Sequence, residues 1–297
     1  MRLKIVKNVE KSFMMVMGGS ALLSIFTTLG IIFVLGEETF HFFRQVPIFD
    51  FLFGATWEPM LEPKSFGVLP LVTGTLLITV GSAIIAIPLG TLSAIYLSEY
   101  ANNKTKSILR PILEVLAGIP TIVYGYFALT FITPILKSVL PQTEVFNALS
   151  GIIVVGIMIL PMVSSLCYDA FQGVPKHLKY GGYAMGATSF EVIGQIVIPA
   201  ALSRILASFI LAMSRAIGET MAVTLAAGSN PVLTINPLHS IQTMTSYIVQ
   251  VALGDTPAGT IEYLTSYAVA ALLFLITLSM NLIGQSVLFK YRSEKLT

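Results

Sequence analysis

Long apolar runs alternate with shorter polar segments along this chain of 297 residues. A helix that crosses the hydrocarbon core of a bilayer needs about 20 mostly apolar residues, and six segments meet that requirement. They cover residues 12–35, 69–97, 111–136, 148–166, 205–227 and 268–289. The pattern therefore predicts an all-α membrane protein with six transmembrane helices.

Lysine and arginine are distributed unequally between the segments that flank these spans. With the N-terminus placed in the cytoplasm, the cytoplasmic segments hold thirteen of the basic residues and the opposite segments hold three. Positive residues are enriched on the cytoplasmic side of membrane proteins, so we expect a multi-pass protein of the cell membrane with both termini in the cytoplasm. The expected parts are an N-terminal helix with an extracytoplasmic segment (1–68), a transmembrane core (69–289) and a cytoplasmic tail (290–297).

The extracytoplasmic segment before the last span carries a helical pattern of its own. Ile241, Met244, Ile248 and Val251 recur there at spacings of three and four residues, which places them on one face of a helix. We expect a short amphipathic helix that either lies on the outer membrane interface or packs over the mouth of the bundle.

Composition supports a lipid-embedded chain and excludes several classes of protein. Charged residues make up 11% of the chain, against about 25% in soluble domains, and the net charge of +2 gives no indication of a nucleic-acid partner. The single cysteine excludes an intrachain disulfide, and the histidines lack metal-ligand spacing. We expect no cofactor, and we expect surface or interface positions for His41, His177 and His239.

Motifs of the common enzyme classes are absent from the sequence. There is no GxxxxGK[ST] loop to cradle the phosphates of ATP. Neither HExxH nor GxSxG occurs, so the chain lacks the metal and nucleophile motifs that a membrane-embedded enzyme needs. We expect a transport subunit whose ATP hydrolysis takes place on separate subunits.

Two charged residues, Arg215 and Glu219, lie inside the fifth predicted span. They are four residues apart, so on a continuous helix they share a face and can form an ion pair; Gly218 between them removes bulk, and Ser214 and Thr220 add hydroxyls. One interpretation is an ion pair that stabilises the bundle. The other, which we favour because ionisable residues within a membrane are usually functional, is a substrate path in which the arginine binds an oxyanion.

The long cytoplasmic segment between the fourth and fifth spans contains several turn and cap signals. Pro175 suits the first turn of a helix, and Gly186 suits the position just after a helix end. Thr188 followed by Glu191 predicts a capping box that starts a second helix, which Pro199 should bend or stop. These signals predict two short helices joined by a tight turn, with an ordinary amphipathic loop as the alternative.

This segment resembles the cytoplasmic loop of ABC importer permeases, in which Glu-Ala-Ala is followed by three residues, Gly, nine residues and Ile-x-Leu-Pro. Gly186 and residues 196–199 match the pattern, whereas Tyr-Gly-Gly at 180–182 replaces Glu-Ala-Ala. The two glycines loosen the helix by roughly 1 kcal/mol each, or they allow a close approach to a partner. In the family this loop is a coupling helix that docks on the ATPase. The resemblance therefore implies that the following residues couple to an ATPase: Lys179, Tyr180, Gly181, Gly182, Gly186, Ala187 and Thr188.

Other strings narrow the resemblance to the phosphate ABC permeases. RAIGETMAV (215–223) resembles their signature helix, and its Thr-Met-Ala-Val ending is similar to the PstC-type subunit rather than to its PstA-type partner. LAGIPTIVYG (116–125) resembles a motif that both subunits share. The resemblance covers nearly the whole chain from about residue 51 onward, and it implies the type I ABC importer permease fold.

The resemblance also implies partners and a mechanism. A PstC-type permease forms a heterodimer with a PstA-type permease, sits on two PstB-type ATPase subunits and receives phosphate from an extracytoplasmic PstS-type binding protein. ATP binding then drives alternating access of the path between them. The residues alone leave two alternatives open, namely a permease for another oxyanion (sulfate, molybdate or tungstate) and a membrane component that senses or signals phosphate.

Overall fold

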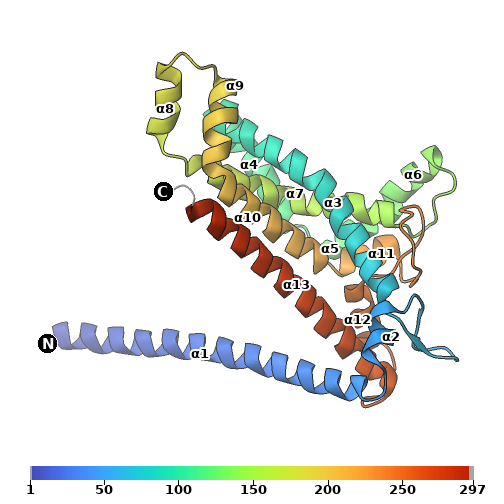
Figure 1. Cartoon of the computed structure of the whole chain (residues 1–297). Coiled ribbons are helices and arrows are strands. Elements are labelled where there is room, and N and C mark those ends of the chain that lie inside the picture. The colour runs from blue at the N-terminus through green and yellow to red at the C-terminus, as the bar shows by residue number, and fades with distance from the viewer. Residues whose placement is uncertain (1, 294–297) are drawn as a thin grey trace.

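The computed structural model describes residues 2–293, nearly all of which are helical or connect helices (Figure 1). The helices are α1 (Arg2–Phe43), α2 (Ile48–Phe53), α3 (Leu69–Ile95), α4 (Asn103–Gly118), α5 (Thr121–Phe127), α6 (Thr133–Val139), α7 (Ala148–Gln172), α8 (Lys176–Ala184), α9 (Ser189–Val192), α10 (Ile198–Ile217), α11 (Met221–Ala227), α12 (Met244–Leu253) and α13 (Ile261–Ser293). The π-helical turns are η1 (Tyr96–Tyr100), η2 (Ala128–Ile132) and η3 (Ile193–Val197). A short hairpin pairs β1 (Trp57–Glu58) antiparallel with β2 (Ser65–Phe66).

The prediction of an all-α protein with six spans is confirmed. Within residues 2–293, six helical runs are long and apolar enough to cross a membrane, and they are Phe13–Phe43, Leu69–Tyr100, Thr121–Val139, Ala148–Gln172, Ser189–Ile217 and Ile261–Ser286. Helix α7 lies at the centre of the bundle, where it packs against α3, α10 and α11. Its buried side chains, including Ile159 and Val163, form much of the core.

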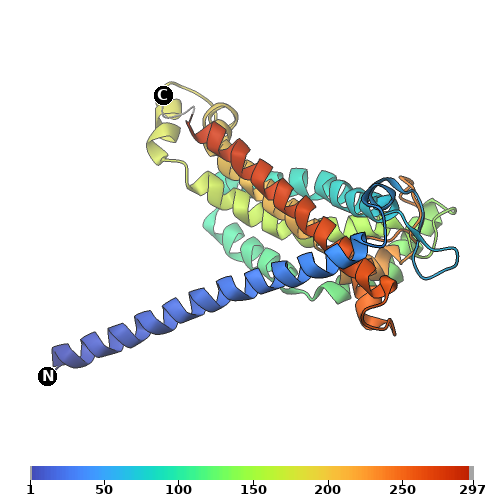
Figure 2. The ribbon, with the colours of Figure 1, turned by 60° about the horizontal axis from the view of Figure 1, so that its bottom comes forward.

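The beginning of α1, the end of α13 and α8 all lie towards one end of the bundle, whereas α2, α6 and α12 lie towards the other (Figures 1 and 2). We call these the α8 end and the α12 end. Helix α1 diverges from the bundle towards its beginning, and near its end Thr39 Oγ1 donates to the carbonyl of Tyr267 at 3.2 Å. Residues 290–293 of the expected tail continue α13, while residues 294–297 and Met1 lie outside the described residues.

The predicted third span (111–136) is wrong in its first part. Pro120 has no N–H and disfavours helical geometry at the preceding residue, so Ile119 adopts φ −67° and ψ 129° and α4 ends at Gly118. Helix α4 is a separate element that starts at an Asn102 cap, and none of its residues is buried. The observed span begins at Thr121.

The predicted fifth span (205–227) and the second short cytoplasmic helix are also corrected. Helix α9 does not stop at Pro199 but passes through the π-helical turn η3 directly into α10. Pro199 lies in the first turn of α10, where a missing N–H is tolerated. The observed span therefore begins at Ser189, and it ends at Ile217 instead of continuing to Ala227.

Helix α12 packs into the bundle instead of lying on its surface. Met244, Tyr247 and Val251 are buried, and the Tyr247 ring meets the Trp57 ring edge to face at a centroid distance of 4.9 Å. Aromatic pairs in this arrangement contribute about 0.5–1.5 kcal/mol beyond their burial. The predicted helix is confirmed from Met244 onward, whereas Ile241 lies before its first residue. Of the two expected places, the structure supports packing against the bundle.

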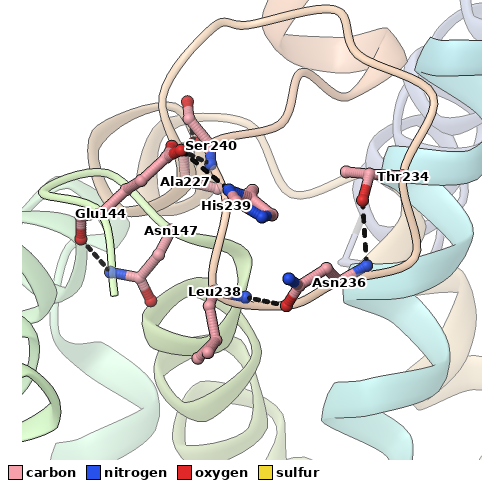
Figure 3. A network of polar contacts seen from close by, with 8 residues as sticks. All are labelled: Glu144, Asn147, Ala227, Thr234, Asn236, Leu238, His239 and Ser240. Carbon is pink, nitrogen blue, oxygen red and sulfur yellow. Dashed lines mark hydrogen bonds and ion pairs between the residues drawn. The ribbon is translucent and has the colours of Figure 1, made fainter. Parts of the chain in front are cut away.

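A polar network ties two loops together at the α12 end (Figure 3). The carboxylate of Glu144, before α7, lies 2.8 Å from His239 Nδ1 and accepts from the backbone N–H of Ser240 at 2.7 Å. These two contacts, with the histidine contributing more, hold the pKa of Glu144 below its ordinary value of 4.5. Asn147 Nδ2 donates to the Glu144 carbonyl at 3.2 Å.

The expected surface positions of His41, His177 and His239 are confirmed, since all three residues are exposed.

We predict that Glu144→Gln lowers the thermal stability of the purified protein at neutral pH. Because the folded pKa of Glu144 is depressed, its contribution is fully present above the unfolded value and is lost as pH falls through the folded value. The difference in unfolding midpoint between wild type and variant should therefore vanish only below about pH 4.5. Glu58→Gln, at an exposed acid of the same end, is the control, and a difference that persists at acid pH contradicts the prediction.

Candidate functional site

The chain leaves the helical path at residues 218–220, which we call the helix break. Helix α10 ends at Ile217, and Gly218 caps it by donating to the Ser214 carbonyl at 3.3 Å. Glycine is about 1 kcal/mol less favourable than alanine in a helix interior, which favours an end here. Helix α11 starts again at Met221. A long helix and a short one thus replace the single continuous span that hydropathy alone predicts.

Glu219 holds this break together from a buried position. Its side chain is drawn onto the next helix, where Oε1 accepts from the backbone N–H of Ala222 at 3.1 Å and satisfies one of the unpaired amides of α11. Its backbone carbonyl accepts from Thr245 Oγ1 of α12 at 2.8 Å. Glu219 therefore joins α10, α11 and α12, a connection that the sequence reasoning missed because Thr245 is 26 residues away.

The four residues predicted to line a substrate path have different surroundings. Arg215 lies in the last turn of α10 and is exposed, and its side chain makes no hydrogen bond or ion pair with any residue between 2 and 293. The ion pair with Glu219 that the first interpretation requires is absent, because the Glu219 carboxylate lies across the break on the N–H of Ala222. Ser214 donates to Asn281 Oδ1 of α13 at 3.0 Å, and Thr220 donates to the Gly218 carbonyl at 3.2 Å.

This arrangement is suited to binding an anion. The guanidinium of Arg215 has a planar fork of donors that matches an oxyanion, and these donors are unused among the described residues. The partial negative charge at the end of α10 also favours a cation in its last turn. Within residues 2–293 there is no group of three His, Cys, Asp or Glu side chains that could hold a metal ion.

The two strings that carried the resemblance meet in space beside the break. Helix α5, which contains the end of LAGIPTIVYG, packs against α11, which contains the end of RAIGETMAV. A Cβ on Gly125 would lie 2.8 Å from Leu225 Cβ and 3.0 Å from Ala222 Cα. Only glycine at this position lets the two short helices approach so closely.

The turn between α8 and α9 has the predicted geometry. Gly186 adopts φ +84°, a left-handed conformation that favours glycine. Its N–H donates to the Tyr183 carbonyl at 3.0 Å, and the N–H of Ala187 donates to the Gly182 carbonyl at 3.2 Å, which closes α8 as a Schellman motif. Thr188 and Glu191 form the expected capping box at the start of α9.

The two adjacent glycines of α8 have different roles. A Cβ on Gly182 would lie 2.5 Å from Ile196 Cδ1 and 3.0 Å from Val192 Cγ2, so this glycine lets α8 pack against α9 and η3. A Cβ on Gly181 would meet nothing within 4 Å. The sequence left open a close approach of these glycines to a partner, but Gly182 allows the close approach of α9 and η3 of the same chain.

Large apolar side chains are exposed around this turn. Met185 is 88% exposed, Phe190 79% and Tyr180 65%. Exposed apolar patches are typical of surfaces that contact another protein or a membrane. We call residues 176–192, which include α8 and α9, the docking segment.

Lys179 of the docking segment turns towards the bundle. Its Nζ lies 2.6 Å from Oε1 of Glu99, and the two side chains are 16% and 11% exposed. Glu99 belongs to η1, at the end of the second span. Sequence reasoning grouped Lys179 with the ATPase-coupling residues and did not consider Glu99.

We predict that Gly182→Val destabilises the protein by about 1–3 kcal/mol, the usual cost of overpacking, because its side chain must displace Ile196 and Val192. The matched control is Gly181→Val, whose side chain enters open space and should change stability by no more than about 0.5 kcal/mol. Thermal unfolding of both purified variants measures the difference. Equal losses at the two positions would show that close packing at Gly182 is unimportant.

The family model described as "binding-protein-dependent transport system inner membrane component" matches residues 86–292 of this chain. A probable ABC transporter permease protein of Bacillus subtilis, YqgH, is 34% identical over 265 residues, which are 89% of this chain and 85% of that protein. The phosphate transport system permease protein PstC of Haemophilus influenzae is 32% identical over 268 residues, or 83% and 82% of the two chains.

Solved structures with a similar fold include a chain of a bacterial alginate ABC transporter in complex with an alginate-pentasaccharide-bound periplasmic protein. It has a TM-score of 0.64 at 15% identity and covers 95% of this chain and 97% of that one. An inward-facing form of the MetNI methionine ABC transporter has a TM-score of 0.57 at 16% identity, with coverages of 78% and 99%. At these identities the similarity concerns the fold alone, and it confirms the expected fold of type I ABC importer permeases.

Proposed function

Since this chain belongs to the family of binding-protein-dependent transport system inner membrane components, we propose that it forms part of the path by which an ATP-driven importer takes up inorganic phosphate. Members of the family are multi-pass transport subunits that are not themselves catalytic, and they work with ATPase and substrate-binding partners. Phosphate as the substrate is supported by relatives named as phosphate transport system permease protein PstC, among them the protein of Haemophilus influenzae and a probable PstC of Methanocaldococcus jannaschii.

The observation that carries the substrate proposal is the unused guanidinium of Arg215 at the helix break. A charge at membrane depth costs at least about 2.5 kcal/mol on the insertion scale, so an arginine without a carboxylate partner in the chain needs another polar partner. Phosphate in a path between two permease subunits meets that need, because its oxygens accept two parallel hydrogen bonds from one guanidinium. Ser214 and Thr220 flank the path, and Glu219 fixes its shape.

The distribution of basic residues supports an orientation with the α8 end in the cytoplasm. In that orientation the docking segment faces an ATPase and the α12 end faces an extracytoplasmic binding protein. The partners are then a PstA-type permease, two PstB-type ATPases and a PstS-type phosphate-binding protein. ATP binding moves the docking segment, and α10 carries that movement to Arg215, so that the path opens alternately to each side.

We predict that Arg215→Ala abolishes phosphate uptake by the reconstituted complex while leaving the complex assembled, because it removes the anion-binding fork. Arg215→Lys should restore little uptake, since an ammonium group cannot donate in the same planar geometry. Arg204→Ala, at another exposed arginine of α10, is the matched control. Normal uptake by Arg215→Ala would refute the substrate-path role.

The choice of phosphate is tested by uptake of labelled phosphate with sulfate, molybdate and tungstate as competitors. We expect excess unlabelled phosphate to compete and the other oxyanions to leave uptake unchanged. Competition by another oxyanion at equal concentration, or no uptake of phosphate at all, would overturn the choice of phosphate while leaving membership of the importer family intact.

We predict that Gly186→Val uncouples ATP hydrolysis from transport, because valine at φ +84° strains the turn that presents the docking segment. Gly259→Val is the matched control, because Gly259 has φ +83° and equally open surroundings but lies at the other end of the molecule. It should keep the wild-type ratio of transport to hydrolysis. The measurement is the number of phosphate ions taken up per ATP hydrolysed, with both rates determined on the same proteoliposomes. If both variants keep the wild-type ratio, the docking assignment is wrong.

A further inference from the structure

The second span ends in the π-helical turn η1, which connects several elements at the α8 end. The N–H of Ala101 donates to the Tyr96 carbonyl at 2.8 Å, five residues back, so the turn is wider than an α-helix. The carbonyl of Ser98 lies at the helix end, where carbonyls lack helical partners. It accepts from Lys106 Nζ of α4 and from Gln172 Nε2 of α7, each at 3.5 Å.

The side chain of Glu99 in this turn reaches α8. Its Oε1 accepts from Lys179 Nζ at 2.6 Å and from Ser98 Oγ at 3.0 Å. Both charged side chains are largely withdrawn from solvent, and charged groups are seldom buried unless they are paired. The pair joins residues that are 80 positions apart in the sequence, so it is a tertiary connection and not part of a local turn.

The most extensive other packing of α8 is with α9 and η3, the elements that directly follow it. Gly182 lets α8 lie against Val192 of α9 and Ile196 of η3, which lead into α10. This contact alone would let α8 pivot about its own loop without moving α3. The Lys179–Glu99 pair provides a second point of attachment, on a different span. A helix held at two points transmits a displacement to both spans instead of rotating between them.

We propose that Glu99 is a positioning residue that, through Lys179, couples movement of the docking segment to the second span. The inference rests on the proposed docking of this segment on an ATPase, and it goes further by assigning a role to a residue outside the segment. Glu99 touches neither substrate nor ATPase in this role. It fixes the orientation of α8, so that a push on α8 moves α3 and α10 together.

The test measures phosphate uptake and ATP hydrolysis on the same proteoliposomes containing the assembled complex. Glu99→Gln and Lys179→Met should each lower the number of ions transported per ATP by at least about fivefold, the lower end of typical coupling between sites. Lys179→Arg keeps the charge and should keep the ratio. The double exchange Glu99→Lys with Lys179→Glu should recover much of the loss, which a merely structural role of either residue does not predict.

Lys104→Met is the control, because Lys104 is exposed on neighbouring α4 and its side chain has no partner among residues 2–293. A wild-type ratio in Glu99→Gln would overturn the proposal, as would equal ratios in Lys179→Met and Lys179→Arg. If Glu99→Gln fails to assemble, the comparison of the two Lys179 variants decides. If the wild-type complex transports another oxyanion, the substrate proposal fails, and the ratio measured with that ion still tests Glu99.

Discussion

The buried carboxylate of Glu219 holds the helix break on which the rest of the candidate site depends. In hydrocarbon every backbone N–H and C=O needs a partner within the protein, so a chain can stop and restart a helix there only where other groups replace the lost bonds. Glu219 supplies an acceptor for the N–H of Ala222, and Thr245 supplies a donor for the Glu219 carbonyl. Arg215 is consequently left at the end of α10 with its donors unused among the described residues.

The break also sets the end of the long helical run that connects the docking segment with Arg215. The helical run Ser189–Ile217 has 29 residues, or roughly 40 Å at 1.5 Å per residue. The docking segment lies at its beginning and Arg215 at its end, so the two sites share a single rod although they are far apart. Helix α8 contacts that rod at Gly182 and contacts the end of the second span through the Lys179–Glu99 pair. The docking segment is therefore attached to two spans of the bundle.

Averaging of hydropathy explains both errors in the predicted spans. Ile119 and Pro120 do not interrupt an apolar window, yet the proline ends α4 because its ring restricts the residue before it. Gly218 and Thr220 are equally inconspicuous in such a window, so Arg215 and Glu219 were placed on one helix face by their spacing of four. The spacing rule holds only on a continuous helix. Across the break, the Glu219 carboxylate accepts from the backbone N–H of Ala222 instead of pairing with Arg215.

The sequence alone determined the features that arise within a few residues of chain. Six apolar runs predict six spans, and the cap at Thr188 and the left-handed turn at Gly186 follow from local backbone chemistry. Tertiary structure alone decided which polar groups meet. Lys179 donates to the carboxylate of Glu99, and Thr245 donates to the backbone carbonyl of Glu219, because folding brings distant segments together and a buried polar group needs a partner within hydrogen-bond reach.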